Sequence, residues 1–473
     1  MKRVDVAIIG AGTAGLSARR EVARYTDSYV VIDDGVLGTT CARVGCMPSK
    51  VLIQVADDFH RRHVFGHAGI RGAEGLAIDQ PAVMQHVRAL RDRFVRSVLG
   101  SMRDWEAKLV RKRARFFDLH TLDLGDEKIR ADRVIIATGS TPIVPRSWEP
   151  HRARLIDTDA FFELETLPRR LAVVGLGVIG LELGQALHRL GVQVTGITLD
   201  KSFGGLSDPE LQQYVYEAVG AEMPIHIGAV TGLSEDDSDL VLDLEGAAPL
   251  RVDAALVAMG RRPNVASLGI EEVGIETERG IPRFDPTTFR VAGTDWYIAG
   301  DVNGTRPLLH EASDEGRIAG YNATREADQC FARRTPLTIT FSHPPIAIVG
   351  ESLRQLEERD ADFVTGSVSY EGQGRAIVKL SECGLLHVYA DRASGRLLGA
   401  ELFAPSGDHL AHLLAWAVTA ELTVQQTLSL PFYHPALEEG VRTALRAAAR
   451  RVEGERAPLE VLRCQDPPVG IQA

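Results

Sequence analysis

Two glycine-rich turns, each preceded by a short apolar run, constrain the fold of this chain more than any other feature. Residues 4–9 run into Gly10, Gly12 and Gly15, and residues 171–174 run into Gly175, Gly177 and Gly180. Such short apolar runs are typical of buried parallel strands, and each turn opens a helical pattern. The glycines permit a tight turn, close approach of a pyrophosphate and packing of helix on strand. Two such units predict two dinucleotide-binding domains.

The two units differ where their second strand ends. Residues 29–32 end at Asp33, which is placed to accept a hydrogen bond from a ribose hydroxyl. The same 23 residues after the first glycine of the second unit comes Thr198, so the carboxylate that selects NAD is missing there. Asp200 and Lys201 follow. We expect a weak preference for NAD, with NADP still open.

A close pair of cysteines, Cys41 and Cys46, follows the first unit. Paired cysteines need Cα atoms within about 7 Å, whereas a five-residue step on a helix rises about 7.5 Å. The pair therefore predicts Cys41 in a distorted lead-in and Cys46 in the first turn of a helix, where the dipole favours thiolate. Gly45 supplies backbone freedom beside the second sulfur. A small structural disulfide, or two buried thiols, remains the alternative at this point.

Composition limits the class of protein. The 473 residues are 45% hydrophobic and 25% charged, which is typical of a globular protein of two to four domains. A net charge of −11 argues against nucleic acid or an anionic membrane as partner. The other cysteines, Cys330, Cys383 and Cys464, are isolated, and no run reads as a signal peptide or bilayer span. We expect a cytoplasmic protein with no metal site.

The rest of the chain alternates predicted strands and helices. Helices are predicted for residues 51–62 and 80–117, a strand for 133–136, and a linker around Pro142, Pro145 and Pro150. The second unit continues with a strand at 192–198, and further strands are predicted at 251–259 and 296–299. The last third has strands at 337–341, 386–390 and 397–403 and helices at 408–421 and 438–455. This order predicts a C-terminal α+β domain.

Two polar positions outside the glycine turns are candidate site residues. Asp301 directly follows a strand, where its carboxylate could bind a polyhydroxyl chain or cap a helix. His434 is followed by Pro435 and, five residues on, by Glu439, which could fix the imidazole tautomer and raise its basicity. A histidine near a glutamate is common, and taken alone it favours a structural role.

Together these segments resemble the flavin-dependent pyridine nucleotide-disulfide oxidoreductases, the family of dihydrolipoamide dehydrogenase, glutathione reductase and mercuric reductase. The resemblance covers nearly the whole chain, in order. Its most specific segments are residues 38–50, 137–140, 260–264, 299–302 and 434–439.

The resemblance implies a role for each candidate residue. The first turn would bind FAD and the second a nicotinamide nucleotide, while His434 and Glu439 would form a base and its orienting carboxylate, acting across a homodimer interface. Cys41 would exchange with substrate and Cys46 would face the flavin, beside a Lys50–Glu182 charge pair. The implied cofactor-binding set is Gly10, Gly12, Gly15, Asp33, Lys50, Thr138, Gly139, Ser140, Asp301, Gly175, Gly177, Gly180, Thr198 and Gly260.

The implied fold is α/β, with two Rossmann-like domains and a C-terminal α+β dimerisation domain. Its expected boundaries are 1–146 and 271–330 for the FAD-binding part, 147–270 for the NAD(P)-binding domain and 331–473 for dimerisation.

The expected activity is that of a dihydrolipoamide dehydrogenase, which oxidises a lipoyl-bearing protein or a small dithiol with NAD⁺. The alternatives are a reductase of another disulfide, of the glutathione, mycothiol or mercuric type, and a low-turnover redox sensor. The chain departs from the family at Thr39, Arg43 and Phe432, and it has Cys464 alone where mercuric reductase has a C-terminal cysteine pair.

Overall fold

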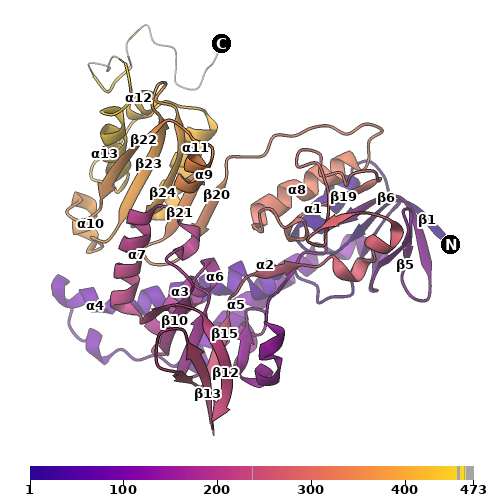
Figure 1. Ribbon diagram of the computed structural model, residues 1–473, viewed down its shortest axis with the longest axis horizontal. Coiled ribbons are helices and arrows are strands. Elements are labelled where there is room, and N and C mark those ends of the chain that lie inside the picture. Colours follow the sequence, from indigo (N-terminus) through magenta and orange to yellow (C-terminus); the bar gives the residue numbers. More distant parts are fainter. Residues whose placement is uncertain (237, 455–458, 463, 465–473) are drawn as a thin grey trace.

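The structure is a computed structural model that describes residues 1–236, 238–454, 459–462 and 464. Three sheets, each with its own helices, form three parts of the molecule: one at the right of Figure 1, one at the bottom and one at the upper left. Helices α3 (Cys46–His60) and α6 (Val178–Arg189) pack together between them. No helix within the described ranges has the length and apolarity needed to cross a membrane.

The first sheet has seven strands and a central parallel core. β1 (Lys2–Ile9) pairs in parallel with β2 and β6. Its residues from Val6 to Ile9 are all buried, as expected for a strand of a parallel sheet that is covered on both faces. Its strands are β3 (Leu109–Val110), β2 (Tyr29–Ile32), β1, β6 (Lys128–Ile136), β5 (Thr121–Asp123) and β4 (Arg115–Asp118) in that order, with β19 (Trp296–Ile298) also on β6. Its helices are α1 (Thr13–Val22), α2 (Thr40–Val44), α3, α4 (Arg62–Phe65), α5 (Gln80–Gly100) and α8 (Leu309–Asn322).

The second sheet is parallel throughout and repeats the first strand–turn–helix unit. Its order is β11 (Ile225–Ile227), β10 (Gln193–Thr198), β9 (Arg170–Val174), β15 (Ala254–Val257) and β8 (Leu155–Asp157), with helices α6 and α7 (Pro209–Glu222). An antiparallel sheet of β12 (Val230–Asp236), β13 (Asp239–Leu244) and β14 (Leu250–Val252) packs against it. Two small antiparallel pairs lie outside these sheets: β7 (Ser140–Pro142) with β16 (Arg261–Pro263), and β17 (Thr277–Glu278) with β18 (Ile281–Pro282), whose Ile281 packs on the core of the first sheet.

The two units have the same backbone contacts. Gly10 has φ +108°, and a Cβ built on it would lie 2.2 Å from the carbonyl oxygen of Ala137. Gly175 has φ +96° and meets the equivalent carbonyl of its own sheet at 2.4 Å. A Cβ on Gly15 or Gly180 would in turn collide with the carbonyl of the first glycine of its unit. Only glycine fits these positions, so the fold is α/β with two Rossmann-like domains.

The C-terminal part is an antiparallel α+β domain. Its strand order is β20 (Leu337–Thr340), β21 (Ile346–Gly350), β24 (Leu397–Phe403), β23 (Leu385–Asp391) and β22 (Phe363–Ser369). Its helices are α9 (Leu353–Glu358), α10 (Gly374–Lys379), α11 (Gly407–Thr419), α12 (Val424–Leu428) and α13 (Glu438–Ala449). The segment between α8 and β20 runs extended across the gap between this domain and the first sheet (Figure 1).

Three expectations about elements were wrong. The helix predicted to Phe117 ends at Gly100. The charged residues after it lie on a 3₁₀ helix (Arg103–Lys108), in the loop 111–114 and on β4, where Phe116 stacks on Trp296. The proline-rich stretch begins with strand β7 rather than a linker. The strand predicted for 251–259 is split between two sheets at Asp253, whose carboxylate binds the backbone and side chain of Arg170.

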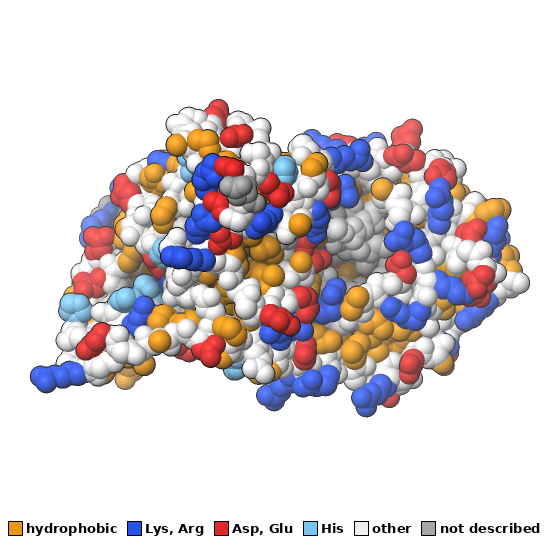
Figure 2. Space-filling model, turned by 90° about the horizontal axis from the view of Figure 1, so that it is seen from below, with side chains coloured by type: hydrophobic (Ala, Val, Ile, Leu, Met, Phe, Trp, Pro, Cys, Tyr) orange, Lys and Arg blue, Asp and Glu red, His pale blue; other side chains and the backbone are white. Residues whose placement is uncertain are grey.

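The predicted C-terminal helix 438–455 ends at Ala449, and its last predicted residue, Glu455, lies outside the described residues, as does most of the tail after it. Charged side chains of both signs are interspersed over the face seen from below in Figure 2. The field over that face therefore has no single sign.

Candidate active site

The two close cysteines lie on two consecutive helices, the five-residue α2 and the longer α3. Cys41 is the second residue of α2, whose N-cap Thr39 accepts a hydrogen bond from Ala42 N at 3.3 Å. Gly45 then separates α2 from α3, which begins at Cys46. Cys46 thus lies in a first turn as expected, whereas Cys41 belongs to a separate regular helix rather than a distorted lead-in. A Cβ on Gly45 would lie 3.3 Å from Cys41 Cα, which allows the two turns to approach closely.

The two thiols are free and hydrogen-bonded to each other, and their acidities diverge. The hydrogen bond from Cys41, helped by the charge of Lys50, lowers the pKa of Cys46 to about 7 against the effect of burial. The same hydrogen bond, together with burial, raises the pKa of Cys41. Of the two sulfurs in the reduced pair, Cys46 is therefore the one that ionises first, as pH rises through about 7.

An ion pair between half-buried Lys50 and buried Glu182 lies one helical turn beyond Cys46. Lys50 Nζ lies 2.7 Å and 2.9 Å from the two carboxylate oxygens of Glu182, on α6. Glu182 also accepts from the backbone N–H of Phe341, whose ring lies 4.6 Å from Lys50 Nζ. This pair joins the helix that carries the thiolate to the second Rossmann-like domain.

Asp33, the acid predicted at the end of the second strand, is hydrogen-bonded to the first glycine turn. Asp33 accepts from Ala11 N at 2.6 Å and from Gly35 N at 2.7 Å, so it braces the turn itself. Gly12 caps α1 with no side-chain hydrogen bond, and a Cβ there would meet nothing within 4 Å. The N-terminus of α1 thus presents free N–H groups and open space, which fit a pyrophosphate.

Asp301 and Ser140, far apart in the sequence, are hydrogen-bonded at the edge of the same domain. Ser140 Oγ donates to Asp301 Oδ2 at 2.8 Å and accepts from Arg261 Nε at 2.9 Å. Thr138 donates to the backbone oxygen of Asn264, and Gly139 O accepts from Asn264 N. The cofactor-binding residues predicted from the sequence did not include Arg261 and Asn264. Both belong to the segment 260–264 that carries the family resemblance, so this motif could have identified them.

The second glycine turn has the same open form. Gly177 caps α6 without a side-chain bond, and space over it is free within 4 Å. Thr198 is the last residue of β10, half-buried, with its backbone oxygen bonded to Gly228 N. Lys201 turns toward α7, donating to Gln213 at 2.6 Å and lying 4.6 Å from the ring of Tyr216. Gly260, with φ +98°, accepts from Ile143 N at its carbonyl.

The candidate base lies in a different domain from the cysteines. His434 Nδ1 lies 3.0 Å and 3.1 Å from the two oxygens of Glu439, and the hydrogen bond from His434 lowers the pKa of Glu439. Because a carboxylate only accepts, Nδ1 carries the proton and Nε2 is left as the basic nitrogen. The His434 side chain is 81% exposed, and no hydrogen bond or ion pair in the described part of the chain joins it to either cysteine.

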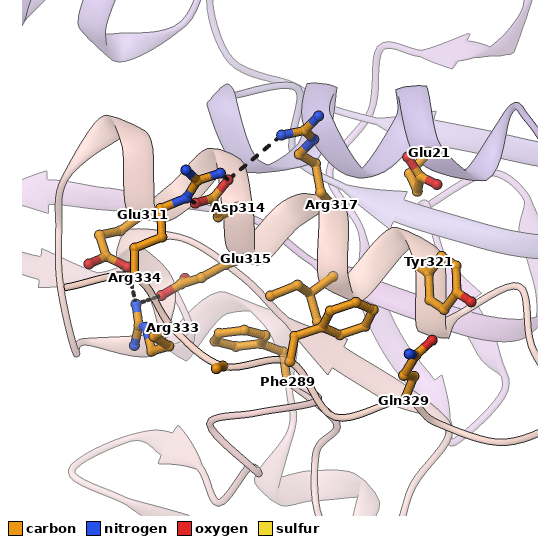
Figure 3. Close-up of a pocket in the computed structure, with 13 residues that line it drawn as sticks. Glu21, Phe289, Glu311, Asp314, Glu315, Arg317, Tyr321, Gln329, Arg333 and Arg334 are labelled. Carbon is orange, nitrogen blue, oxygen red and sulfur yellow. Dashed lines mark hydrogen bonds and ion pairs between the residues drawn. The ribbon is translucent and has the colours of Figure 1, made fainter. Parts of the chain in front are cut away.

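A pocket of about 370 Å³ lies between α8 and the segment that leads to β20. Figure 3 shows aromatic side chains such as Phe289 and Tyr321 on one side and carboxylates paired with Arg333 and Arg334 on the other. It contains no residue of the predicted site.

The chain belongs to the pyridine nucleotide-disulphide oxidoreductases. The family model of that description matches residues 4–316, and the model of the family's dimerisation domain matches residues 337–445. FAD and NAD(P)(H) are the cofactors of this family and of this chain. The second match supports a homodimer.

Individual relatives include enzymes with different substrates. The chain is 28% identical to a dihydrolipoyl dehydrogenase of Bacillus subtilis over 94% of this chain and 96% of that protein. It is 26% identical to a mercuric reductase of Lysinibacillus sphaericus over 93% of this chain and 82% of that protein.

Two solved structures have the same fold. The Cu(II) complex of the HOCl-induced flavoprotein disulfide reductase RclA from Escherichia coli has a TM-score of 0.81 at 23% identity, covering 94% of this chain and 99% of that one. LpdA from Mycobacterium tuberculosis has a TM-score of 0.81 at 24% identity, with the same coverage.

Proposed function

We propose that the chain is a dihydrolipoyl dehydrogenase-type enzyme that oxidises a dithiol, protein-bound or small, and passes the electrons to NAD⁺. The observation that carries this proposal is the hydrogen-bonded pair of Cys41 and Cys46, with Cys46 poised as a thiolate beside Lys50. A structural disulfide has no need for such a difference in acidity between its sulfurs.

The proposed reaction is a thiol–disulfide exchange between the substrate and the cysteine pair. In the oxidised state the two cysteines form a disulfide, and His434 Nε2 accepts the proton of one substrate thiol. The resulting thiolate attacks Cys41 Sγ, and Cys46 leaves as the thiolate because its pKa is the lower of the two. The second substrate thiol then attacks the substrate sulfur of the mixed disulfide, and its proton passes to the Cys41 sulfur that leaves. This releases the oxidised substrate and leaves Cys41 as a thiol, Cys46 as a thiolate and the first proton on His434. FAD and NAD⁺, when bound, carry the two electrons onward.

His434 acts on the partner subunit's cysteines in this proposal. Its side chain and that of its neighbour Tyr433, 83% exposed, face outward on the domain that matches the dimerisation model. The glycine turn capped by Gly12, with Asp33, Ser140 and Asp301, is proposed to bind FAD. The turn capped by Gly177, with Thr198, is proposed to bind the nicotinamide nucleotide.

The test compares substrates on the flavin-loaded protein. We expect reduction of NAD⁺ by dihydrolipoamide to exceed the oxidation of NADH or NADPH by glutathione disulfide or Hg²⁺. Cys41→Ser and Cys46→Ser should abolish this activity, and His434→Gln should lower kcat by about 10²–10⁴-fold. Cys330→Ser, which changes an exposed cysteine elsewhere, is the control and should leave it unchanged. Faster turnover with Hg²⁺ or another disulfide would assign the chain to a different branch of the family.

A further inference from the structure

Helix α6 carries a buried polar stripe made of Glu182, Gln185 and Arg189. The spacing of three and four residues places all three side chains on one face of the helix, and all three are buried. This face looks toward α3, which lies beside α6 in Figure 1. Only the first member of the stripe was expected from the sequence.

The stripe holds α3 at two points. Glu182 binds Lys50, and Arg189 Nη1 binds Asp57 Oδ1 at 2.6 Å. Both helices advance seven residues between the two ion pairs, about 10 Å along each axis, so α3 and α6 run parallel and are fastened at both ends of two turns. In the first pair α3 carries the cation and α6 the anion, and in the second pair α3 carries the anion and α6 the cation.

The stripe also fastens two other parts of the molecule. Gln185 donates to His343 O and accepts from His343 N, which secures the segment after β20. Arg189 makes a second ion pair with Glu222 of α7, inside its own domain. Although burial opposes it, the hydrogen bonds and charge of Arg189 lower the pKa of Glu222, so that carboxylate stays ionised.

We propose that Arg189 is a positioning residue for the redox centre and acts through Asp57. Cys46 is the first residue of α3 and Lys50 lies one turn later, so a rotation or shift of α3 against α6 changes the field that Lys50 and Glu182 exert on the Cys46 sulfur. The Arg189–Asp57 bond limits that movement two turns further along α3. The titratable groups that face these carboxylates are His343, whose Nδ1 lies 3.8 Å from Asp57 Oδ2, and His60, whose Nδ1 lies 3.9 Å from Glu222 Oε1. The proposal rests on the redox role of Cys46 and on no particular substrate.

A direct effect of the Asp57 charge on Cys46 has the opposite sign and is small. Eleven residues of helix separate them by about 16 Å, twice the screening length of about 8 Å at physiological salt. A negative charge raises the pKa of a thiol, so its removal by a purely electrostatic route would lower the pKa of Cys46. Positioning predicts a rise in the pKa of Cys46, because Lys50 Nζ is no longer held by Glu182 in the place from which its charge lowers that pKa.

The experiment measures the pH dependence of Cys46 alkylation by iodoacetamide in the reduced, flavin-loaded protein, with the modified cysteine identified by peptide mass spectrometry. We expect Asp57→Ala to raise the midpoint from about 7 by up to about one pH unit. Asp57→Glu, which retains the charge and the bond, should restore most of the shift. Glu222→Ala is the matched control, because it removes the other partner of Arg189 and keeps the Arg189–Asp57 bond. Glu222 approaches α3 at the last residue of that helix, His60, at a distance of 3.9 Å, and the midpoint should stay in place.

An unchanged or lower midpoint in Asp57→Ala would overturn the proposal, and so would an equal rise in Glu222→Ala, because the stripe would then act by general loosening. If Asp57→Ala fails to fold, Asp57→Asn keeps the volume and one acceptor and is read in the same way. Since no dithiol is used, a chain that does not oxidise dihydrolipoamide still gives a decisive result here.

Discussion

Cys41 and Cys46 have identical side chains and only four residues between them, yet the pKa of Cys41 is raised and that of Cys46 is lowered. The hydrogen bond between them makes one sulfur the donor and the other the acceptor, and Lys50 lies on the acceptor's side. Burial penalises both thiolates, so the hydrogen bond and the Lys50 charge decide which sulfur ionises. A thiolate at the start of α3 is further favoured by the helix dipole.

Lys50→Met is predicted to raise the pKa of Cys46, because the attractive charge is lost and Glu182 remains as a repulsive one. A rise of about one unit takes the thiolate fraction at pH 7 from about one half to about one tenth. Titration of the thiolate absorbance in the ultraviolet measures this directly. Lys50→Arg preserves the charge and should stay near the wild-type curve; a Lys50→Met curve at or below the wild-type midpoint would show that Lys50 does not act on Cys46.

Thr198 predicts a preference for NAD(H) that is weaker than a carboxylate would give. Its hydroxyl can bond a ribose but repels no 2′-phosphate, and Lys201 is turned toward Gln213 and Tyr216. Thr198→Glu should widen the preference about ten-fold, if about 1.4 kcal/mol of discrimination is gained. Steady-state kinetics with both nucleotides check this, with Thr198→Ser as control. A clear NADP(H) preference in the wild type would contradict this account of the pocket.

At the scale of elements, the packing of α8 on α1 shows how glycines place the first binding turn. A Cβ on Gly316 would lie 2.2 Å from Ala14 O, and one on Gly320 would lie 2.6 Å from Ala18 O. The two helices therefore touch backbone to backbone, directly behind the turn that starts at Gly10. No other residue allows that distance.

Gly316→Ala is predicted to lower the free energy of unfolding by about 1–3 kcal/mol and to weaken FAD retention, because α1 must move away. Gly220→Ala is the matched control: this glycine is exposed on α7 with nothing within 4 Å of an added Cβ. Gly220→Ala should leave the free energy of unfolding unchanged or raise it by up to about 1 kcal/mol, because alanine has the higher helix propensity. Thermal unfolding and flavin content after gel filtration measure both variants, and equal behaviour of the two would refute the tight-packing explanation.

The same element shows where prediction from sequence succeeded and where it stopped. The strand–turn–helix units were predictable because glycine spacing and apolar runs are local signals, and β2 was found to the residue. Helix α8 was missed because glycines at 316 and 320 lower helix propensity, and only the contact with α1 explains them. The Arg189–Asp57 bond was missed for a similar reason: it joins residues 132 apart, and nothing local marks them as partners.

At the scale of the whole molecule, the proposed site is divided between subunits. The cysteines lie centrally, at the junction of the three parts, whereas His434 lies on the outer surface of the C-terminal domain. In the proposed mechanism a single chain carries both halves of the site on separate surfaces, and the site is completed by a second copy.

Mixed dimers test this division. A heterodimer of one Cys46→Ser chain and one His434→Ala chain contains one wild-type site if the sites are shared, and none if each chain works alone. Random mixing of the two inactive homodimers should restore about one quarter of wild-type dithiol oxidation, because about half the dimers are mixed and each has one good site. Co-expression with two affinity tags isolates the heterodimer; a fully active wild-type monomer in sedimentation would contradict the shared site.

The central claim, that Cys41 and Cys46 form the redox pair between substrate and flavin, is tested most directly by counting thiols during anaerobic titration with NADH. One equivalent of NADH per chain is predicted to produce two new alkylatable thiols, mapped to Cys41 and Cys46, with a long-wavelength absorbance band from the thiolate beside the flavin. In Cys46→Ser the same equivalent should bleach the flavin and produce no new thiol. Wild-type flavin that bleaches while both cysteines stay unchanged would contradict the account.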